Sequence, residues 1–137
     1  MYVFVSSVDS TQMYPNNSPV DFQINLPETI AKDDGLLYMG LIDIKLPPVT
    51  GAAQVVTLFS SICDVSNVGG AKLPVVRRFL ASTDPSRTYH TFPETVYVPV
   101  KARNIRHIRF YIKGVEEGSA PSFDKGTVFA TFHFLRA

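Results

Sequence analysis

Apolar and polar side chains alternate along three segments of the chain. In residues 20–26 and 107–113 every second side chain is apolar and its neighbours are polar or charged, which predicts strands with one face on the core and one in solvent. Residues 128–135 also carry apolar side chains at alternate positions, but Phe129 and His133 between them are bulky. We therefore expect this last strand to be covered on both sides.

Shorter apolar runs bounded by turn residues predict further strands. They lie in residues 2–6, 36–46, 55–65, 74–80 and 95–100. Residues 36–46 carry large apolar groups on both faces, which predicts a central strand. The 10 Pro and 8 Gly residues interrupt the chain too often for long helices, so we expect helical turns only in residues 27–32 and 103–107.

These elements predict an all-β fold, an eight-stranded antiparallel β-sandwich. The chain has 137 residues, which suits a single domain over residues 1–137. Two connections, residues 66–73 and 81–93, are long enough to cross from one sheet to the other. Such crossings favour a Greek-key or jelly-roll topology over a simple meander.

Composition and charge narrow the class of protein. Hydrophobic residues make up 45% and charged residues 18% of the chain, which excludes intrinsic disorder. The net charge is +1, but residues 1–70 hold two Lys against seven acids and residues 71–137 hold eleven Lys or Arg against five acids. The two halves could form complementary patches, or their strands could interleave into a mixed surface, as in most β folds.

The search for catalytic chemistry is negative, so we expect no enzyme, no cofactor and no metal. The sequence has no phosphate-binding loop, nucleophile elbow or zinc-protease helix. His90, His107 and His133 stand far apart in the sequence, and the single cysteine, Cys63, lies among apolar residues and is expected to be a buried, inert thiol. The carboxylate pairs at residues 33–34 and 116–117 flank glycines and indicate turns.

Basic residues are concentrated in residues 101–113, where Arg103, Arg106 and Arg109 lie close to Tyr111. On a strand, Arg109 and Tyr111 share one face, which could track the phosphates of a single-stranded nucleic acid. A solvated face or a protein interface is the better interpretation, so we expect no nucleic-acid partner. A second basic pair stands at Arg77 and Arg78, and one of the two is expected to point outward.

The N-terminus has no basic segment followed by a long apolar one, so we expect no signal peptide. The longest apolar run, residues 36–46, is about half a membrane span and contains two charged residues. We therefore expect no contact with a membrane and synthesis in a reducing compartment. Residues 1–10 are either a strand of the sandwich or an arm that pairs with a neighbouring subunit.

Three stretches together resemble one protein family. They are residues 10–27, which begin Ser-Thr-Gln-Met-Tyr-Pro and contain Val-Asp-Phe, residues 37–47, which read Leu-Tyr-Met-Gly-Leu-Ile-Asp-Ile-Lys-Leu-Pro, and residues 97–134, which close with Phe-Asp-Lys-Gly-Thr-Val and Thr-Phe-His-Phe. Their order and spacing resemble the penton-like, or minor, capsid proteins of Polinton/Maverick elements and adintovirus-type DNA viruses.

The resemblance implies a single jelly roll that serves as a capsid subunit in the virion, made in the cytoplasm of the host cell. Its partners would be copies of itself, with a pentamer favoured, and other capsid proteins. Subunits would meet through lateral contacts. The candidate interface residues are three tyrosines near strand ends and five arginines: Tyr14, Tyr89, Tyr97, Arg77, Arg78, Arg103, Arg106 and Arg109.

A second interpretation stays open. A β-sandwich of this size can also be a ligand- or receptor-binding module, such as a spike head or a sugar-binding domain. Exposed aromatic side chains near loops would favour it.

Overall fold

Two antiparallel sheets pack face to face in the computed structural model, which describes residues 1–32, 35–68, 70–114 and 121–137. The turns expected at residues 33–34 and 116–117, and Gly69 of the turn expected at residues 69–70, lie outside the described residues.

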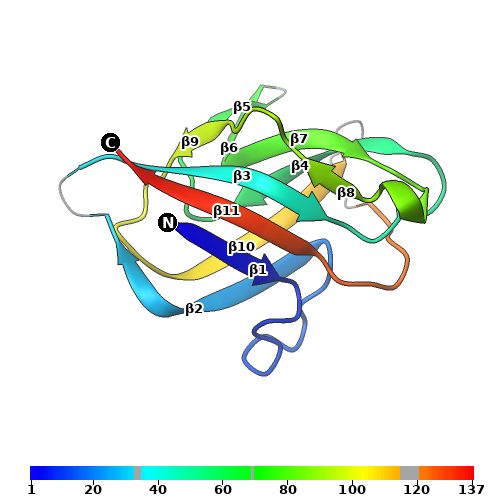
Figure 1. The fold of residues 1–137 in the computed structure, drawn as a ribbon, viewed down its shortest axis with the longest axis horizontal. Helices are drawn as coiled ribbons and strands as arrows, with labels where there is room; N and C mark the ends of the chain where they lie inside the picture. Colours follow the sequence, from blue (N-terminus) through cyan, green and yellow to red (C-terminus); the bar gives the residue numbers. More distant parts are fainter. Residues whose placement is uncertain (33–34, 69, 115–120) are drawn as a thin grey trace.

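One sheet has five strands in the order β1-β11-β3-β8, with β9 also pairing with β3 (Figure 1). Its strands are β1 (Tyr2–Ser6), β3 (Leu37–Lys45), β8 (Tyr89–Thr91), β9 (Tyr97–Pro99) and β11 (Phe129–Arg136). The strand β3 is central, as predicted, because β11 pairs with one of its edges and β8 and β9 with the other.

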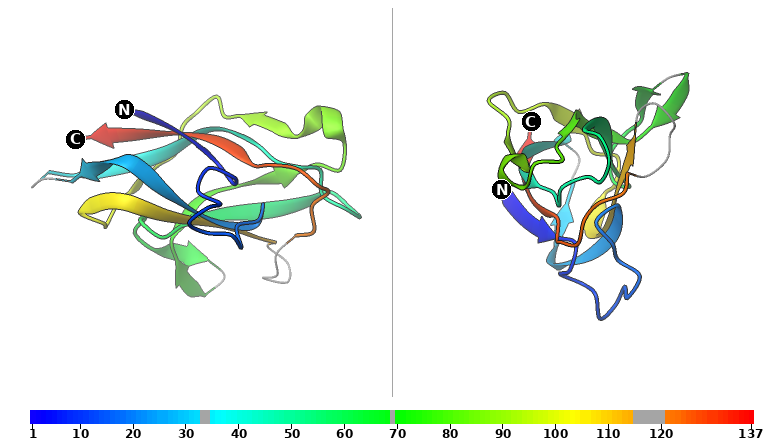
Figure 2. Two further views of the ribbon diagram at one scale, coloured as in Figure 1. Left: turned by 90° about the horizontal axis from the view of Figure 1, so that it is seen from below. Right: turned by 90° about the vertical axis from the view of Figure 1, so that its right-hand side faces the viewer.

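The second sheet has four strands in the order β2-β10-β4-β7. They are β2 (Asp21–Ala31), β4 (Gln54–Ser60), β7 (Val75–Ala81) and β10 (Asn104–Gly114). A short hairpin of β5 (Ser66–Val68) and β6 (Ala71–Leu73) projects from the sandwich (Figure 2). The described residues thus contain eleven strands, where the sequence predicted eight.

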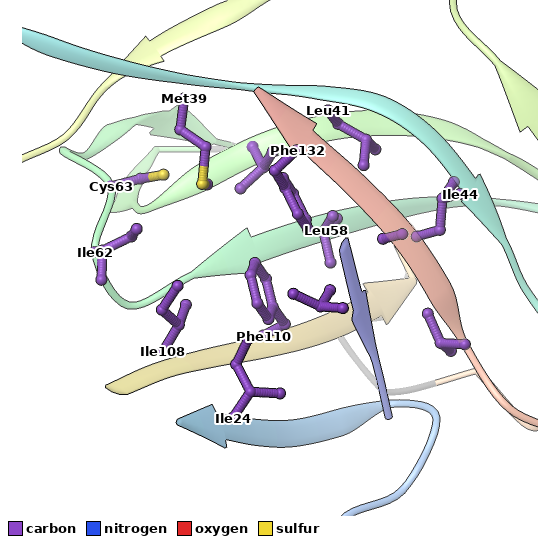
Figure 3. Close-up of a cluster of buried hydrophobic side chains, with 14 of the residues drawn as sticks. Ile24, Met39, Leu41, Ile44, Leu58, Ile62, Cys63, Ile108, Phe110 and Phe132 are labelled. Atoms are coloured by element: carbon purple, nitrogen blue, oxygen red, sulfur yellow. The ribbon is translucent and has the colours of Figure 1, made fainter. Parts of the chain in front are cut away.

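The core lies between the inner faces of the two sheets. Phe110 of β10 and Phe132 of β11 point toward each other from opposite sheets, with ring centroids 4.8 Å apart (Figure 3). Phe22 of β2 packs on Phe110 at 5.5 Å. The alternation in residues 20–26 and 107–113 is confirmed, because every apolar position of those strands except Val20 is buried.

Both helical turns expected from the sequence are wrong. Residues 27–31 continue β2, where Ile30 is buried and pairs with Ile105. Pro27 is tolerated because β2 is an edge strand, so the missing N–H breaks no ladder bond. Residues 104–107 are the first part of β10, where the register shifts between Ile105 and His107. The bulge obscured the period of two in the sequence.

The two long connections behave differently. Residues 82–88 leave β7 in the four-stranded sheet and enter β8 in the five-stranded sheet, so the crossing predicted there is confirmed. The crossing predicted for residues 66–73 is wrong, because this segment is the β5–β6 hairpin and the chain returns to the same sheet. Gly70, with φ +86°, supplies the positive dihedral angle that its turn requires.

The edge of β2 is closed by the loop of residues 7–20. The side-chain amide of Asn17 donates to the backbone carbonyl oxygen of Gln23 at 2.8 Å. The same amide accepts a hydrogen bond from the backbone N–H of Gln23, also at 2.8 Å. The Asn25 N–H donates to Oγ of Ser10 at 3.1 Å. These side chains take the place of a neighbouring strand, which protects an otherwise open edge.

Candidate functional site

The three tyrosines predicted as contact anchors lie on different faces of the sandwich. Tyr89 and Tyr97 stand on the outer face of the five-stranded sheet and are exposed. Tyr14 lies in the loop that covers β2, where its hydroxyl donates to Oδ1 of Asn25 at 3.0 Å and its ring contacts that of His107. Both contacts lie within the chain.

Arg77 and Arg78 differ as predicted, one half-buried and one exposed. The guanidinium of Arg77 lies 4.0 Å from the ring centroid of Phe92 and donates to the carbonyl oxygen of Glu94 at 2.8 Å. Arg77 thus ties β7 to the segment between β8 and β9. Arg78 is exposed, and its Nε lies 3.4 Å from Oγ1 of Thr57.

The remaining arginines lie along β10 and before it. Arg109 donates to both carboxylate oxygens of Asp21, at 2.9 and 2.6 Å, and this hydrogen bonding raises the pKa of the guanidinium. Arg103 and Arg106 are exposed at the start of β10. Arg78 on β7 and Arg109 on β10 both belong to the outer face of the four-stranded sheet.

A row of facing residues crosses the outer face of the five-stranded sheet. Tyr2 pairs with His133, His133 with Gly40, and Gly40 with Tyr97. The Tyr97 hydroxyl lies 2.8 Å from Nδ1 of His133, and the His133 ring lies 4.6 Å from that of Tyr2. A Cβ on Gly40 would lie 2.4 Å from Cγ2 of Thr95. The absence of a side chain at Gly40 therefore lets this row close over β3.

Large apolar side chains stay uncovered around this row. Phe4 and Phe129 are 76% and 54% exposed. The expectation that residues 128–135 are covered on both sides is wrong for the single chain, since only the alternate face, with Phe132 and Phe134, packs on the core. Sequence analysis missed Tyr2, Phe4 and Gly40. Tyr2 and Phe4 share one face of a strand because they are two positions apart, but nothing in the sequence indicated which face of residues 2–6 was covered.

The outer face of the four-stranded sheet is more polar. Phe59 and Tyr111 stack at 4.8 Å, with the Arg109 guanidinium 4.7 Å from the Tyr111 ring centroid and the Lys113 ammonium 5.8 Å from it. Burial raises the pKa of Tyr111. The predicted sharing of one face by Arg109 and Tyr111 is confirmed, and His107 and Lys113 stand on the same side of β10.

A cleft of about 560 Å³ lies between the loop of residues 7–20 and this face. Tyr14, Asn16 and Asn17 line it from the loop, and Gln23 and Arg109 from the sheet. Planar amide and guanidinium groups beside an aromatic ring can bind a polar ligand by hydrogen bonds and stacking.

The halves of opposite charge do not segregate into two sides. Each sheet combines strands from both halves, because β11 lies between β1 and β3 and β10 lies between β2 and β4. The strands of the two halves therefore interleave, which is the second of the two alternatives offered by the sequence.

The three histidines lie in three different surroundings. His107 is on the outer face of the four-stranded sheet and bonds Gln23, whereas His133 is on the other outer face. His90 faces Phe79, and its Nε2 is buried without a partner among the described residues. No three His, Cys, Asp or Glu side chains in the described part of the chain could hold a metal ion together.

Cys63 is fully buried, as predicted. Desolvation raises the pKa of its thiol to about 12, so at neutral pH the sulfur is protonated and a poor nucleophile. Among the described residues no helix is long and apolar enough to span a membrane.

No protein-family model, curated protein or solved structure matches this chain at a significant level.

Proposed function

We propose that this protein is a viral capsid subunit, a penton-like vertex or minor capsid protein, built as a single jelly roll that works by self-association. Its partners would be further copies of the chain, in a pentamer, and other capsid proteins of the virion. Assembly would follow synthesis in the cytoplasm of the host cell.

The nested strand pairing carries the fold part of the proposal. The first strand pairs with the last (β1 with β11), the second with the second-last (β2 with β10), and then β3 with β8 and β9, and β4 with β7. Such nesting arises when one long antiparallel hairpin is wrapped into two sheets, as in a jelly roll. Counting β8 and β9 as one interrupted strand, with β5–β6 as an insertion, leaves eight strand positions.

Surface chemistry supports the self-association part. A soluble monomer rarely exposes a contiguous apolar patch larger than a few hundred Å², yet Tyr2, Phe4, Phe129 and Leu135 lie exposed on adjacent strands of one sheet. The three stretches that resemble the capsid family also fall on the loop over β2, on β3, and on β9 to β11.

The molar mass of the purified protein in solution, measured by light scattering over a range of concentrations, tests the proposal. We expect a discrete oligomer, with five copies favoured. A monomer at every concentration would contradict self-association. The same measurement at low and high salt separates apolar contacts, which salt preserves, from ion pairs, which it screens.

The cleft beside Tyr14 favours a second candidate, a saccharide-binding module. Binding of the monomer to a glycan array, lost in an Asn16→Ala/Arg109→Ala variant that still folds, would support this candidate. No binding by the folded protein would remove it.

A further inference from the structure

We propose that the outer face of the five-stranded sheet packs against the outer face of the four-stranded sheet of a second copy. This inference rests on the proposed self-association and assigns its two surfaces. The first surface, the aromatic face, consists of Tyr2, Phe4, Tyr89, Tyr97, Phe129 and Leu135. The second, the cationic row, consists of Arg78 and Lys113, which lie on either side of the buried Thr57 on neighbouring strands.

The aromatic face is continuous across the sheet. One row runs from Tyr2 through His133 and Gly40 to Tyr97, and another runs from Ser6 through Phe129 and Lys45 to Tyr89. Between them lies the row of Phe4, Thr131, Asp43 and Thr91. These rows lie on strands that pair directly, so their side chains stand next to one another on the same side of the sheet.

The exposed area of the aromatic face approaches one side of a standard interface. The six side chains of the aromatic face are between 36% and 76% exposed. Since a buried aromatic side chain covers roughly 150–250 Å², the five rings alone offer on the order of 500–600 Å². A standard interface buries about 800 Å² per partner, so the aromatic face supplies most of one side of such an interface.

The cationic row offers the complementary chemistry. Arg78 and Lys113 are exposed, and neither forms an ion pair with another described residue. On the same face Val55 and Leu80, which pair with each other, are 42% and 56% exposed. A cation attracts the face of an aromatic ring, most strongly where water is excluded, and the apolar pair extends the contact beyond the charges.

The aromatic face, in turn, suits a cationic partner. Its formal charges are those of Asp43 and Lys45, and the Asp43 carboxylate accepts from the Tyr89 hydroxyl at 3.1 Å. A cation placed beside Asp43, on the side away from Lys45, meets the carboxylate and the ring of Tyr89. Within the chain the same chemistry already joins two segments, where Arg77 lies over Phe92.

The two surfaces belong to different sheets, which lie on opposite sides of the sandwich (Figure 2). A contact between two different surfaces is head-to-tail, and it leaves one of each surface unused at the ends of every open chain of subunits. Such a contact closes into a ring where successive copies are rotated about a common axis, and it otherwise continues as an open stack. We expect the ring because the proposed function is a pentamer. A face-to-face dimer would use one surface twice and leave the other uncovered.

Complementation between two variants tests the assignment. The variant Phe4→Ser/Phe129→Ser removes two rings of the aromatic face, and the variant Arg78→Glu/Lys113→Glu reverses the charge of the cationic row. All four side chains are exposed. Both proteins should therefore fold with the circular dichroism and melting temperature of the wild type. Val65→Ser, another exposed apolar position on the β5–β6 side, is the matched control. Molar mass is measured by light scattering for each protein alone and for the equimolar mixture.

We expect each double variant alone to be monomeric, with self-association weakened at least about tenfold, and Val65→Ser to assemble as wild type. The mixture should form a 1:1 dimer, because each variant keeps the surface that the other lacks. A double variant that assembles as wild type, or two monomeric variants that do not complement, would overturn the assignment and leave self-association standing. A monomeric wild-type protein would overturn both.

Discussion

The hydroxyl of Tyr97 and Nδ1 of His133 lie 2.8 Å apart, and they meet over Gly40, which pairs with both residues. The contact joins β9 and β11 across the strand that separates them. The Tyr97 ring can lie over β3 because Gly40 has no side chain there.

Gly40→Ala is therefore expected to destabilise the fold. The new Cβ would lie 2.4 Å from Cγ2 of Thr95 and 3.1 Å from the Tyr97 ring, and overpacking of this kind costs about 1–3 kcal/mol. Urea unfolding gives the change in the free energy of unfolding. Gly35→Ala is the control, because its Cβ would lie 3.6 Å from its nearest neighbour. Equal effects at the two glycines would contradict the close packing over Gly40.

Phe132→Ala should cost about 3–5 kcal/mol of unfolding free energy. The Phe132 ring is 1% exposed and stacks on Phe110 across the two sheets. Phe129→Ala, three residues earlier on the same strand, should change the stability of the monomer by less than about 0.5 kcal/mol because its ring faces solvent. The comparison is made by urea unfolding at a concentration at which both proteins are monomeric. A large loss for Phe129→Ala would mean that its ring packs within the chain.

The stability of the protein should fall as the solution is acidified, through His90. Burial lowers the pKa of His90 from its usual value of 6.5, because a charged ring is poorly solvated there and Nε2 has no partner among the described residues. The unfolded chain then takes up the proton at a higher pH than the folded protein does. The contribution of neutral His90 to the free energy of unfolding is therefore complete above pH 6.5, and it decreases as the pH falls below that value.

Urea unfolding at about pH 7.5 and about pH 5.5 measures this loss. His90→Leu should reduce the difference between the two pH values, whereas His107→Gln, at an exposed histidine, should retain it. A His90→Leu variant with the full wild-type difference would show that another group is responsible.

The ion pair of Asp21 and Arg109 should contribute little to stability despite its short distances. Both side chains are nearly half exposed, at 44% and 46%, so water and salt screen their attraction. A double-mutant cycle with Asp21→Asn and Arg109→Gln should give a coupling energy of about 0–1 kcal/mol. A coupling well above that range would mean that the pair is more strongly desolvated than its exposure indicates.

Local patterns in the sequence predicted most strands because burial repeats with a period of two. Ile108, Phe110 and Ile112 are all buried and mark the second part of β10. The pattern failed where the backbone departs from that period. At Ile105 and His107 the ladder shifts register, and the residues around the bulge read as a helical turn.

The candidate surface was less predictable than the fold. Phe4 and Val5 are neighbours of similar hydrophobicity, yet one is 76% exposed and the other 4%. Which of them faces the core depends on how β1 pairs with β11, a contact between opposite ends of the chain. The pairing of Arg109 with Asp21 likewise joins residues 88 positions apart, which no local spacing indicates.

The side-chain amide of Asn17 limits the ways in which copies of this protein can join. Because it occupies the N–H and carbonyl of Gln23 at the edge of β2, no strand from another molecule can extend the four-stranded sheet at that point. Continuous growth of sheets from edge to edge is the route to fibres. A single loop side chain thus favours assemblies of finite size over unlimited polymerisation.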